Sequence, residues 1–481
     1  MAGHIMVKIN SQQALNHFSK KEKVLGQFFT PKEVADFIIE FILLNSKRKE
    51  KAIDPACGDG VFLEGLIERN FKEIVGIDID KKVVDSIPQK IKKKAKIINI
   101  DGLLFEPENH FDVLVSNPPF SAKYGRVQDK NILTIFELGR KAKSQAIEIL
   151  FLEKFIRLAS EGGIIGVVLP FGIISNNNLK AVRKYLFEKT KILGVISLPR
   201  FIFNGNASTS SKTCILFLQK GKTKGKYKVF MSIVKKLDEL KDVVDLYAKK
   251  KEKKDLAFWT EIEGDNLTPE FYNPKYKEVE KELQCSPFKV CKLKELITEM
   301  FCGRTEYGSK RVFSNNGIPF ISAKVITNFG IDFSKDRKFI SKDSEMFKPK
   351  SLVKKEDLIF VRVGVGCIGR TAVVTSEEDL GVIDDWSYII RTKKNISPYF
   401  LAFYLQSKYG KIQLERIKRG VGTVTIPQSS LKEILVPVFE NQEIFKKQYL
   451  KMRELYKKGL ITEAEKIFND TLQDIERAIK G

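Results

Sequence analysis

The stretch Asp54-Pro55-Ala56-Cys57-Gly58-Asp59-Gly60 decides the fold that the sequence predicts. It follows a short apolar run over 51–54, which predicts a buried strand, and it opens a helical pattern over 60–69. Glycines in such a turn let the backbone approach a ligand closely, and the helix N-terminus offers unpaired N–H groups. A strand, a glycine-rich turn and a helix in this order indicate an α/β domain with a ligand site at the turn.

The same alternation of apolar runs and helical patterns extends from about residue 26 to 220 and predicts a largely parallel sheet. We expect helices over 31–44 and 146–159, the first one capped by Thr30 with Pro31 at its first position. Seven strands are expected, at residues 51–54, 74–78, 96–100, 113–116, 164–169, 192–197 and 213–218. The fold class is therefore α/β, with a seven-stranded and mostly parallel sheet.

The character of the sequence changes after residue 225. Lysine-rich turns surround one amphipathic helix over 226–285, which predicts a connecting region between the domain at 1–225 and the rest of the chain. Glycines and short β-branched runs dominate 286–440 and predict an α+β domain with strands at 318–321 and 358–363. Two helical patterns separated at Gly459 then predict a C-terminal helical hairpin over 441–481.

The composition narrows the classes of function. The 481 residues include three histidines, and none lies in the pattern of a Ser-His-Asp triad or of a zinc motif. Six scattered cysteines form no C-x-x-C pair, and no stretch approaches eighteen uncharged apolar residues. We therefore expect no metal, no transmembrane helix and a cytoplasmic location. The formal charge of +24 indicates a polyanionic partner.

Acidic side chains close two further predicted strands. Asp78 ends the strand after Asp54, at a separation where a carboxylate commonly accepts the ribose hydroxyls of a nucleoside cofactor. Asp101 closes the third strand, where a carboxylate could accept a hydrogen bond from an adenine amino group. An acidic residue at a strand end is more often simply solvated, but in strand order within one fold these residues reinforce one another.

A second stretch, Asn117-Pro118-Pro119-Phe120, follows the apolar strand over 111–116. Two consecutive prolines cannot continue a sheet, so they predict a stiff loop at the edge where open α/β sheets bind ligands. The Asn117 side-chain oxygen and the Pro118 carbonyl could accept both hydrogens of an exocyclic amine and so localise its lone pair. Phe120 would then stack on the base. A purely structural turn is the alternative interpretation.

Three stretches together resemble a known family: Gly26-Gln27-Phe28-Phe29-Thr30-Pro31, the loop over 54–60 and Asn117-Pro118-Pro119-Phe120. They resemble the gamma class of S-adenosylmethionine-dependent N6-adenine DNA methyltransferases. Within that class the chain is similar to the TaqI methyltransferase and to the modification subunits of type I restriction systems. The resemblance implies a class I (Rossmann-like) methyltransferase fold, S-adenosyl-L-methionine as cofactor and a flipped adenine in double-stranded DNA as substrate.

The resemblance also implies roles for individual residues. The residues implied to bind the cofactor are Thr30, Asp54, Ala56, Gly58, Asp78, Ile79, Asp101 and Asn117. The catalytic residues are those of the Asn117-Pro118-Pro119-Phe120 loop, and Phe120 also stacks on the target base. The stretch over 198–203 resembles the family segment whose aromatic residue stacks on the base from the other side. Phe203 is our candidate, Phe201 is the alternative, and a core position for either is the other interpretation.

The resemblance continues into the C-terminal half. The stretches over 317–322 and 357–364 resemble a target-recognition domain of type I specificity subunits, which normally carry two such domains. The stretch over 364–369 matches G-x-G-x-x-G, but a strand pattern follows it instead of a helix, so we expect a glycine-rich β-turn. Arg362, Arg370 and Lys324 are the candidate DNA-binding residues.

Several alternatives stay open at this stage. The Asn-Pro-Pro-aromatic motif also occurs in enzymes that methylate protein glutamine or ribosomal RNA, a related motif serves N4-cytosine methylation, and the catalytic half could be inert beside a DNA-binding module. The family's type I members carry a long helical N-terminal domain, whereas about 25 residues precede Gly26 here. We find no nuclease motif, so a restriction endonuclease subunit on another chain is one candidate partner. A homodimer through the C-terminal helices is another.

Overall fold

The computed structural model describes residues 30–46, 48–121, 125–200, 202, 212–223, 225–303, 311–364, 366–420 and 424–481. The chain divides into two compact units, the first ending at Glu270 and the second beginning at Phe271. Each unit has its own hydrophobic core. Within the described ranges, no helix is both long enough and apolar enough to cross a lipid bilayer.

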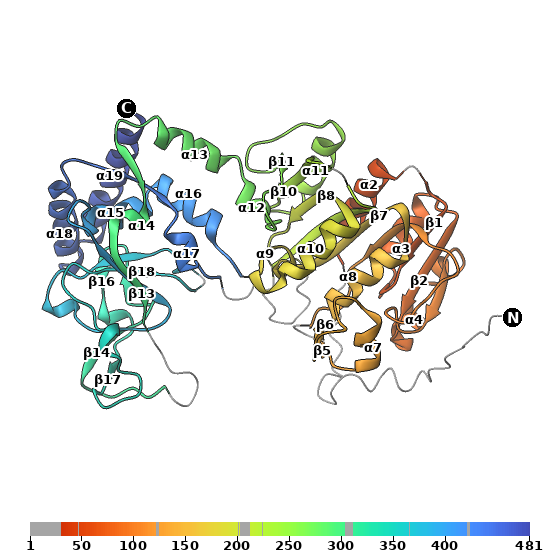
Figure 1. Ribbon diagram of the computed structural model, residues 1–481, viewed down its shortest axis with the longest axis horizontal. Helices are drawn as coiled ribbons and strands as arrows, with labels where there is room; N and C mark the ends of the chain where they lie inside the picture. The colour runs from red at the N-terminus through yellow and green to blue at the C-terminus, as the bar shows by residue number, and fades with distance from the viewer. Residues whose placement is uncertain are drawn as a thin grey trace. The chain divides into compact units, whose positions relative to one another are not determined.

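A sheet of nine strands organises the described part of the first unit (Figure 1). Its strand order is β11-β10-β8-β9-β7-β4-β1-β2-β3. The strands are β1 (Lys51–Asp54), β2 (Glu73–Asp78), β3 (Lys96–Asn99), β4 (Phe111–Ser116), β7 (Ala159–Pro170), β8 (Thr190–Ser197), β9 (Thr213–Lys220), β10 (Lys228–Ile233) and β11 (Ala257–Glu261). Only β9 and β11 run antiparallel to their described neighbours, so the predicted, mostly parallel α/β architecture is confirmed.

The predicted count of seven strands is wrong, because the described sheet has nine. All seven predicted strands are present, and β10 and β11 come from the stretch over 226–285 that we expected to connect two domains. These strands were not predicted because lysine-rich segments flank them, although the strands themselves contain apolar residues. Phe230 of β10 is buried, and its ring lies 5.1 Å from the ring of Trp259 in β11. The first unit therefore extends to residue 270, and the helix α13 (Lys275–Gln284) belongs to the second unit.

Helices cover both faces of the nine-stranded sheet. Val113 and Val115 of β4 pack in one core cluster with α2 (Lys32–Asn45), while Leu114 between them is also buried and faces the opposite side. Gly166 of β7 allows α2 to pack closely, since a Cβ atom there would lie 2.7 Å from an Ile38 methyl group. The other helices of this unit are α3 (Val61–Glu68), α4 (Lys81–Ser86), α5 (Gln89–Lys92), α7 (Lys130–Ile135), α8 (Ile147–Leu158), α9 (Gly172–Ser175), α10 (Lys180–Lys189) and α11 (Glu239–Ala248), and a short ribbon pairs β5 (Arg126–Val127) with β6 (Gln145–Ala146).

The described residues of the second unit form several small sheets instead of one large sheet. Its largest described sheet is four-stranded and antiparallel, in the order β13-β21-β18-β19. The strands of this unit are β12 (Lys289–Lys292), β13 (Ile297–Cys302), β14 (Ile318–Ile321), β15 (Ile326–Thr327), β16 (Gly330–Ile331), β17 (Phe339–Ile340), β18 (Leu358–Val361), β19 (Thr371–Val373), β20 (Val382–Ile383), β21 (Ser387–Thr392) and β22 (Leu435–Val438). Strands β14 and β18 were predicted from the sequence, and β19 follows the glycine-rich stretch over 364–369 as expected.

Helices complete the core of the second unit. The short connector α12 (Pro269–Tyr272) precedes α13, and the remaining helices are α14 (Leu293–Leu296), α15 (Pro398–Gln406), α16 (Lys408–Ile417), α17 (Gln428–Leu431), α18 (Glu443–Lys457) and α19 (Ile461–Lys480). The last two helices lie side by side, with Gly459 at a positive φ of 77° in the turn between them. Their buried residues, such as Tyr449 and Phe468, join the same cluster as Phe403 of α15.

Candidate active site

The carboxyl ends of the parallel strands gather the predicted cofactor residues at one edge of the nine-stranded sheet. Asp54 is the last residue of β1, Asp78 is the last residue of β2, and Asn117 directly follows β4. Strands β3, β2, β1 and β4 are consecutive neighbours and run parallel, so these residues and Asp101, just after β3, meet at the same edge. The structure thus brings together side chains that lie far apart in the sequence.

Hydrogen bonds join the Asp54 loop to the Asn117 loop. The Ser116 hydroxyl donates to Asp54 Oδ1 at 2.7 Å, and the Ala56 N–H donates to the same oxygen at 3.1 Å. Asn117 Nδ2 donates to the Thr30 hydroxyl at 3.1 Å. Our prediction that Thr30 caps α2 is wrong, because Pro31 is the capping residue and makes no side-chain cap bond. The Thr30 hydroxyl instead holds Asn117.

The Asp54 carboxyl group is fully buried, and its Oδ2 atom has no hydrogen-bond partner among the described residues. Burial raises the pKa of Asp54 to about 7, although the Ser116 bond opposes this shift. An uncompensated buried carboxylate oxygen is costly unless a ligand satisfies it. At the nearby Gly58, φ is 51° and a Cβ atom would meet nothing within 4 Å, so there is open space beside the loop. The site fits a ligand that carries an ammonium group.

Asp78 holds the same loop from the neighbouring strand. Its Oδ2 accepts the Gly58 N–H at 3.0 Å, and its Oδ1 accepts the Asp80 N–H at 2.9 Å. Burial raises the pKa of Asp78 above its ordinary value. The next residue, Ile79, is held through its carbonyl, which accepts a hydrogen bond from Asn99 Nδ2 at 3.1 Å. The carboxylate and the loop that it orients are therefore fixed before any ligand binds.

Asp101 is brought against the Asp54 loop by the glycine that follows it. A Cβ atom on Gly102 would lie 2.0 Å from the Pro55 carbonyl oxygen, so only glycine permits this approach. Asp101 Oδ1 accepts the Leu103 N–H at 2.9 Å. Sequence reasoning missed both Gly102 and Ser116. A glycine shortly after β3 and a hydroxyl residue at the end of β4 were the available signals.

The Asn117-Pro118-Pro119-Phe120 loop lies between the cofactor residues and the start of α8. Pro118 is buried, and the half-buried Phe120 packs against the same hydrophobic cluster as α2 and α3. Phe203 and the alternative Phe201, predicted to stack on a target base, lie outside the described residues.

Cys57 lies within the Asp54 loop but is unsuited to nucleophilic chemistry. Its side chain is buried, and burial raises the pKa of the thiol well above its ordinary value. A thiol acts as a nucleophile in its thiolate form. Cys57 therefore has a packing role, and its N–H donates to the Ile77 carbonyl at 2.8 Å.

A charged cluster stands at the same edge, where β7 and β8 end. The Ser197 hydroxyl donates to Glu270 Oε1 at 2.5 Å, and Lys212 forms an ion pair with the same carboxylate. The Lys212 ammonium lies 4.1 Å from the centre of the Phe171 ring, directly after β7. Glu270, the last residue of the first unit, is thereby tied to this edge of the sheet.

The candidate DNA-binding residues of the second unit differ in exposure. Arg362 follows β18, and its Nη1 donates to the Asp385 carbonyl at 2.5 Å while its guanidinium lies 5.3 Å from the centre of the Tyr388 ring. Arg370 precedes β19 and donates from Nη2 to the Gly366 carbonyl at 3.1 Å. Both arginines are half-buried, whereas Lys324 is exposed. Arg370 thus also supports the glycine-rich turn, and Arg362 holds the turn that precedes β21.

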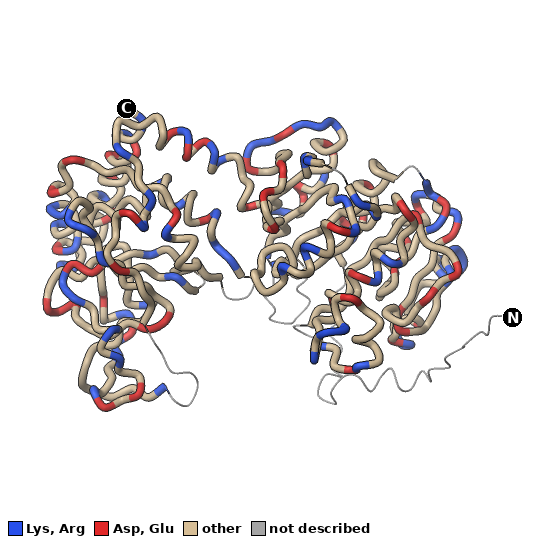
Figure 2. Tube along the Cα trace, in the orientation of Figure 1, with Lys and Arg blue, Asp and Glu red and all other residues tan. Residues whose placement is uncertain are grey.

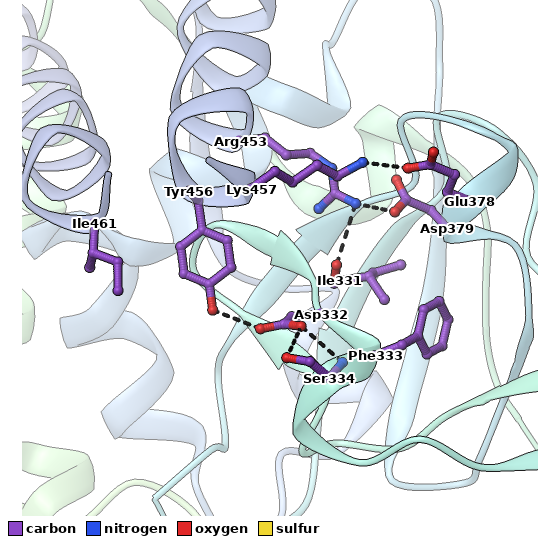
Figure 3. Close-up of a pocket in the computed structure, with 10 residues that line it drawn as sticks. All are labelled: Ile331, Asp332, Phe333, Ser334, Glu378, Asp379, Arg453, Tyr456, Lys457 and Ile461. Carbon is purple, nitrogen blue, oxygen red and sulfur yellow. Dashed lines mark hydrogen bonds and ion pairs between the residues drawn. The ribbon is translucent and has the colours of Figure 1, made fainter. Parts of the chain in front are cut away.

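A pocket of about 430 Å³ lies in the second unit beside α18 (Figure 3). Arg453 is buried at its wall and pairs with the buried carboxylate of Asp379. The Tyr456 hydroxyl donates to Asp332 Oδ2 at 2.8 Å on the other side, as Figure 3 shows. Since the polar groups of this pocket bind mainly one another, we interpret it as a structural junction between α18 and the strands.

Comparison with known families agrees with this arrangement of two units. Residues 11–266 match the sequence model of the N-6 DNA methylase family. The chain belongs to the N-6 DNA methylase family. Residues 286–465 match a second model, that of the type I restriction modification DNA specificity domain. The matched ranges correspond to the two compact units, and the family resemblance predicted from the three sequence motifs is confirmed.

Relatives within the N-6 DNA methylase family are similar over part of their length. The chain is 29% identical over 219 residues to the type I restriction enzyme EcoEI methylase subunit of Escherichia coli, covering 41% of this chain and 43% of that protein. It is also 29% identical over 176 residues to the type II methyltransferase M.TthHB8I of Thermus thermophilus. That match covers 34% of this chain and 38% of that protein. The chain thus spans less than half the length of these curated relatives.

One solved structure is similar over both units. The type IIG restriction endonuclease BpuSI superposes with a TM-score of 0.50 at 15% identity, covering 91% of this chain and 61% of that one. At this identity the likeness concerns the fold. The similarity extends over residues of both units, since it covers 91% of this chain.

Proposed function

We propose that the chain transfers a methyl group from S-adenosyl-L-methionine to the N6 amino group of a flipped adenine in double-stranded DNA. The observation that carries this proposal is the pairing of two features at one sheet edge. One is the buried Asp54 carboxylate with an unpartnered oxygen, and the other is the Asn117 amide held by Thr30. Membership of the N-6 DNA methylase family supports adenine as the base.

The residues at the edge suit the successive parts of the cofactor. Asp54 Oδ2 would accept the ammonium of the methionine part, with Thr30, Ala56 and Gly58 around it. Asp78 would accept the ribose hydroxyls, since each carboxylate oxygen has lone pairs beyond the single N–H that it now accepts. Ile79 would pack on the cofactor adenine, and Asp101 would accept from its amino group. When bound, the sulfonium supplies an electrophilic methyl group.

Asn117 and Pro118 would prepare the amine of the target base. The lone pair of an exocyclic amine is delocalised into the ring, and hydrogen-bond acceptors for both amine hydrogens localise it on nitrogen. The Asn117 amide is planar, so the bond from its nitrogen to Thr30 directs its oxygen away from Thr30 as an acceptor. The Pro118 carbonyl is the second acceptor. No strong base is needed, which agrees with the scarcity of histidine.

The target adenine must leave the duplex to reach this edge. We propose that Phe120 stacks on one face of the flipped base and that Phe203 stacks on the other. The half-buried state of Phe120 supports the first contact, because part of the ring stays open to a ligand. A stacked base gains about 1–3 kcal/mol per contact, enough to offset much of the unstacking cost.

We propose that the second unit recognises the DNA sequence and that Arg362, Arg370 and Lys324 contact the DNA. Its match to the type I specificity domain supports this role. In the first unit the turn over 249–254 carries five lysines and one glutamate and is mostly blue in Figure 2. This concentration of positive charge would attract a polyanion such as the DNA backbone.

We further propose two protein partners and a cytoplasmic location. A restriction endonuclease subunit on another chain would supply cleavage. A second copy of this chain would pair through a C-terminal hairpin of α18 and α19, where Ile444, Leu460 and Ile461 are exposed at 52%, 42% and 50%. Pairing two copies would bring together two recognition units. Light scattering with and without residues 441–481 tests this, and an unchanged monomer mass would contradict it.

The proposed activity is tested by the choice of methyl acceptor. The full chain is incubated with S-adenosyl-L-methionine carrying a tritiated methyl group and, separately, with duplex DNA, ribosomal RNA and a mixture of cellular proteins. We expect label in duplex DNA alone. Label in ribosomal RNA or protein would contradict the proposal, and cofactor binding without transfer to any acceptor would indicate an inert catalytic unit.

A further inference from the structure

Helix α8 carries two buried glutamates that bind two different loops. Glu148, 6% exposed in its first turn, accepts the Ser121 N–H at 2.8 Å and the Ser121 hydroxyl at 2.9 Å. Glu153, fully buried one and a half turns further on, accepts the N–H groups of Glu137 and Leu138, both at 2.8 Å. The two side chains make the same kind of double hydrogen bond, but only Glu148 binds next to the Asn117-Pro118-Pro119-Phe120 loop.

The loop depends on side chains at its two ends. Pro118 and Pro119 have no N–H group, so the middle of the loop offers no main-chain donor that could fix it. Its first end is held where the Ser116 hydroxyl donates to Asp54 and Asn117 donates to Thr30. Its second end is Ser121, directly after Phe120.

Burial makes the Glu148 contact strong. A carboxylate that accepts two hydrogen bonds in a water-poor environment forms charge-assisted bonds, which are about twice as strong as neutral ones. The two bonds use both Glu148 oxygens and both donors of Ser121, so the position and the orientation of Ser121 are fixed together. The Phe120 ring and the Pro118 carbonyl lie between this anchor and the anchor at Asn117.

We propose that Glu148 is a positioning residue for methyl transfer, which it serves by holding Ser121 and thereby the Pro118 carbonyl and the Phe120 ring in place. The inference rests on the proposed function. Since the described contacts of Glu148 are to Ser121, and not to Asp54 or Asp78, the effect belongs to the target-base side of the site. Loss of the Glu148 carboxylate should therefore lower the rate of methyl transfer and leave cofactor binding intact.

The experiment compares Glu148→Ala and Glu148→Gln with the matched controls Glu153→Ala and Glu153→Gln in the full chain. Unmethylated genomic DNA is the substrate, and kcat, the KM for DNA, the Kd for S-adenosyl-L-methionine by calorimetry and the melting temperature are measured. We expect Glu148→Ala to lower kcat about 10- to 100-fold, as misplacing reacting groups by about 1 Å does. Glu148→Gln retains an acceptor oxygen and should recover part of the loss.

The controls separate positioning from general destabilisation. Both Glu153 variants should lower the melting temperature at least as much as the Glu148 variants, because Glu153 also pairs with Arg157, yet keep kcat within about threefold of the wild type. Cofactor Kd should stay within about twofold in all four variants. A wild-type kcat in Glu148→Ala, or an equal kcat loss in Glu153→Ala, would overturn the inference.

Ser121→Ala keeps the test decisive if Glu148→Ala does not fold. It removes one of the two bonds, so kcat should fall several-fold, and combining it with Glu148→Gln should cost less than the sum of the single effects. Additive losses would contradict a shared anchor. A wild-type protein that transfers no methyl group to DNA refutes the proposed function and this inference with it. An active wild type with unaffected Glu148 variants refutes the inference alone.

Discussion

The two units gather their polar residues in different ways. In the first unit, parallel strands of one sheet end at a common edge, so Thr30 and Asn117, 87 positions apart, are hydrogen-bonded there. In the second unit the candidate arginines come from two strands that are consecutive in the sequence, β18 and β19, although other strands there, such as β12 and β22, pair over a long separation. Arg362 and Arg370 lie at the same sheet end because β18 ends where β19 begins.

The two units also differ in whether their candidate functional side chains have a structural role as well. At the edge of the large sheet the hydrogen bonds between strands fix the backbone, and in the proposed function single side chains such as Asp54 each have a separate role. In the second unit the candidate arginines also hold turns together. We therefore expect substitutions in the first unit to change individual steps of the reaction and substitutions in the second unit to change stability and DNA affinity together.

The largest effect should follow Asn117→Ala. We expect kcat to fall by about 10²–10³-fold or more, the range found when a hydrogen-bonding group that acts on the reacting atoms is removed. The cofactor Kd should change little, because Asp54 and Asp78 remain. Turnover is measured with saturating duplex DNA and binding by calorimetry. Retained turnover would contradict the proposed difference between the two units, since the sheet edge would then not be the catalytic region.

A stability effect should follow Arg453→Met in the second unit. Removing one partner of a buried ion pair costs about 3–5 kcal/mol, here by leaving Asp379 buried and uncompensated. Urea unfolding followed by tryptophan fluorescence measures it, with Lys457→Met in the exposed pair with Glu378 as the control expected to leave unfolding unchanged. Lost cofactor binding in folded Arg453→Met protein would contradict the separation of the two units.

The pH dependence of cofactor binding should follow Asp54. Its pKa of about 7 means that the carboxyl group is increasingly protonated below that value, whereas a cationic ammonium requires the ionised form. The affinity for S-adenosyl-L-methionine should therefore fall by up to about tenfold for each pH unit below 7. Asp54→Asn should weaken binding and remove this dependence.

The matched control is Asp384 in the second unit, whose pKa burial also raises to about 7. For both residues the folded-state pKa lies above the ordinary value, so the stability that each contributes is present at low pH and lost as the pH rises through about 7. Asp384→Asn should flatten the fall of melting temperature with pH but leave the pH dependence of cofactor affinity unchanged. A changed cofactor profile in Asp384→Asn would count against the assignment to Asp54.

A smaller effect is expected at the DNA-binding candidates. Lys324→Ala should weaken binding to all DNA sequences a few-fold and lower the slope of log affinity against log salt by about one. Arg370→Ala should do the same and also lower the melting temperature, because it loses its bond to the Gly366 carbonyl. Lys184, exposed on α10 of the first unit, is the control. Fluorescence anisotropy over a salt series measures all three, and an unchanged slope in Lys324→Ala removes it from the interface.

The smallest effect should follow Cys57→Ser. Direct transfer to an amine needs no covalent enzyme intermediate, and burial keeps this thiol protonated. We expect activity within a few-fold of the wild type, with a small loss of stability from placing a hydroxyl in a buried position. Complete loss of turnover in a folded variant would show that the Asp54 loop supplies a nucleophile.

The sequence predicted where the polar residues of the first unit meet more fully than it predicted how far that unit extends. The motifs identified Asp54, Asp78 and Asn117, because residues at the ends of parallel strands must meet at one edge. Strands β10 and β11 were not predicted, because their short apolar runs are flanked by lysine-rich segments that are typical of exposed loops. The Thr30 contact was unpredictable, because a threonine before a proline is equally typical of a helix cap.

The second unit was less predictable in its details. Two strands and the glycine-rich turn were recognisable from local patterns, and the turn has positive φ at Gly364, Gly366 and Gly369. The hydrogen bonds from Arg362 and Arg370 to backbone carbonyls could not be predicted from local patterns, because they depend on the three-dimensional arrangement of the turns. Glu148 gave no signal either, since a glutamate in the first turn of a helix is usually solvated.

The central claim is tested most directly by identifying the modified base. Duplex DNA of mixed sequence is incubated with the full chain and S-adenosyl-L-methionine, digested to nucleosides and analysed by mass spectrometry, with Asn117→Ala as the control. We predict N6-methyladenine with the wild-type chain and none above background with the variant. N4-methylcytosine, or N6-methyladenine in equal amounts with Asn117→Ala, would contradict the account.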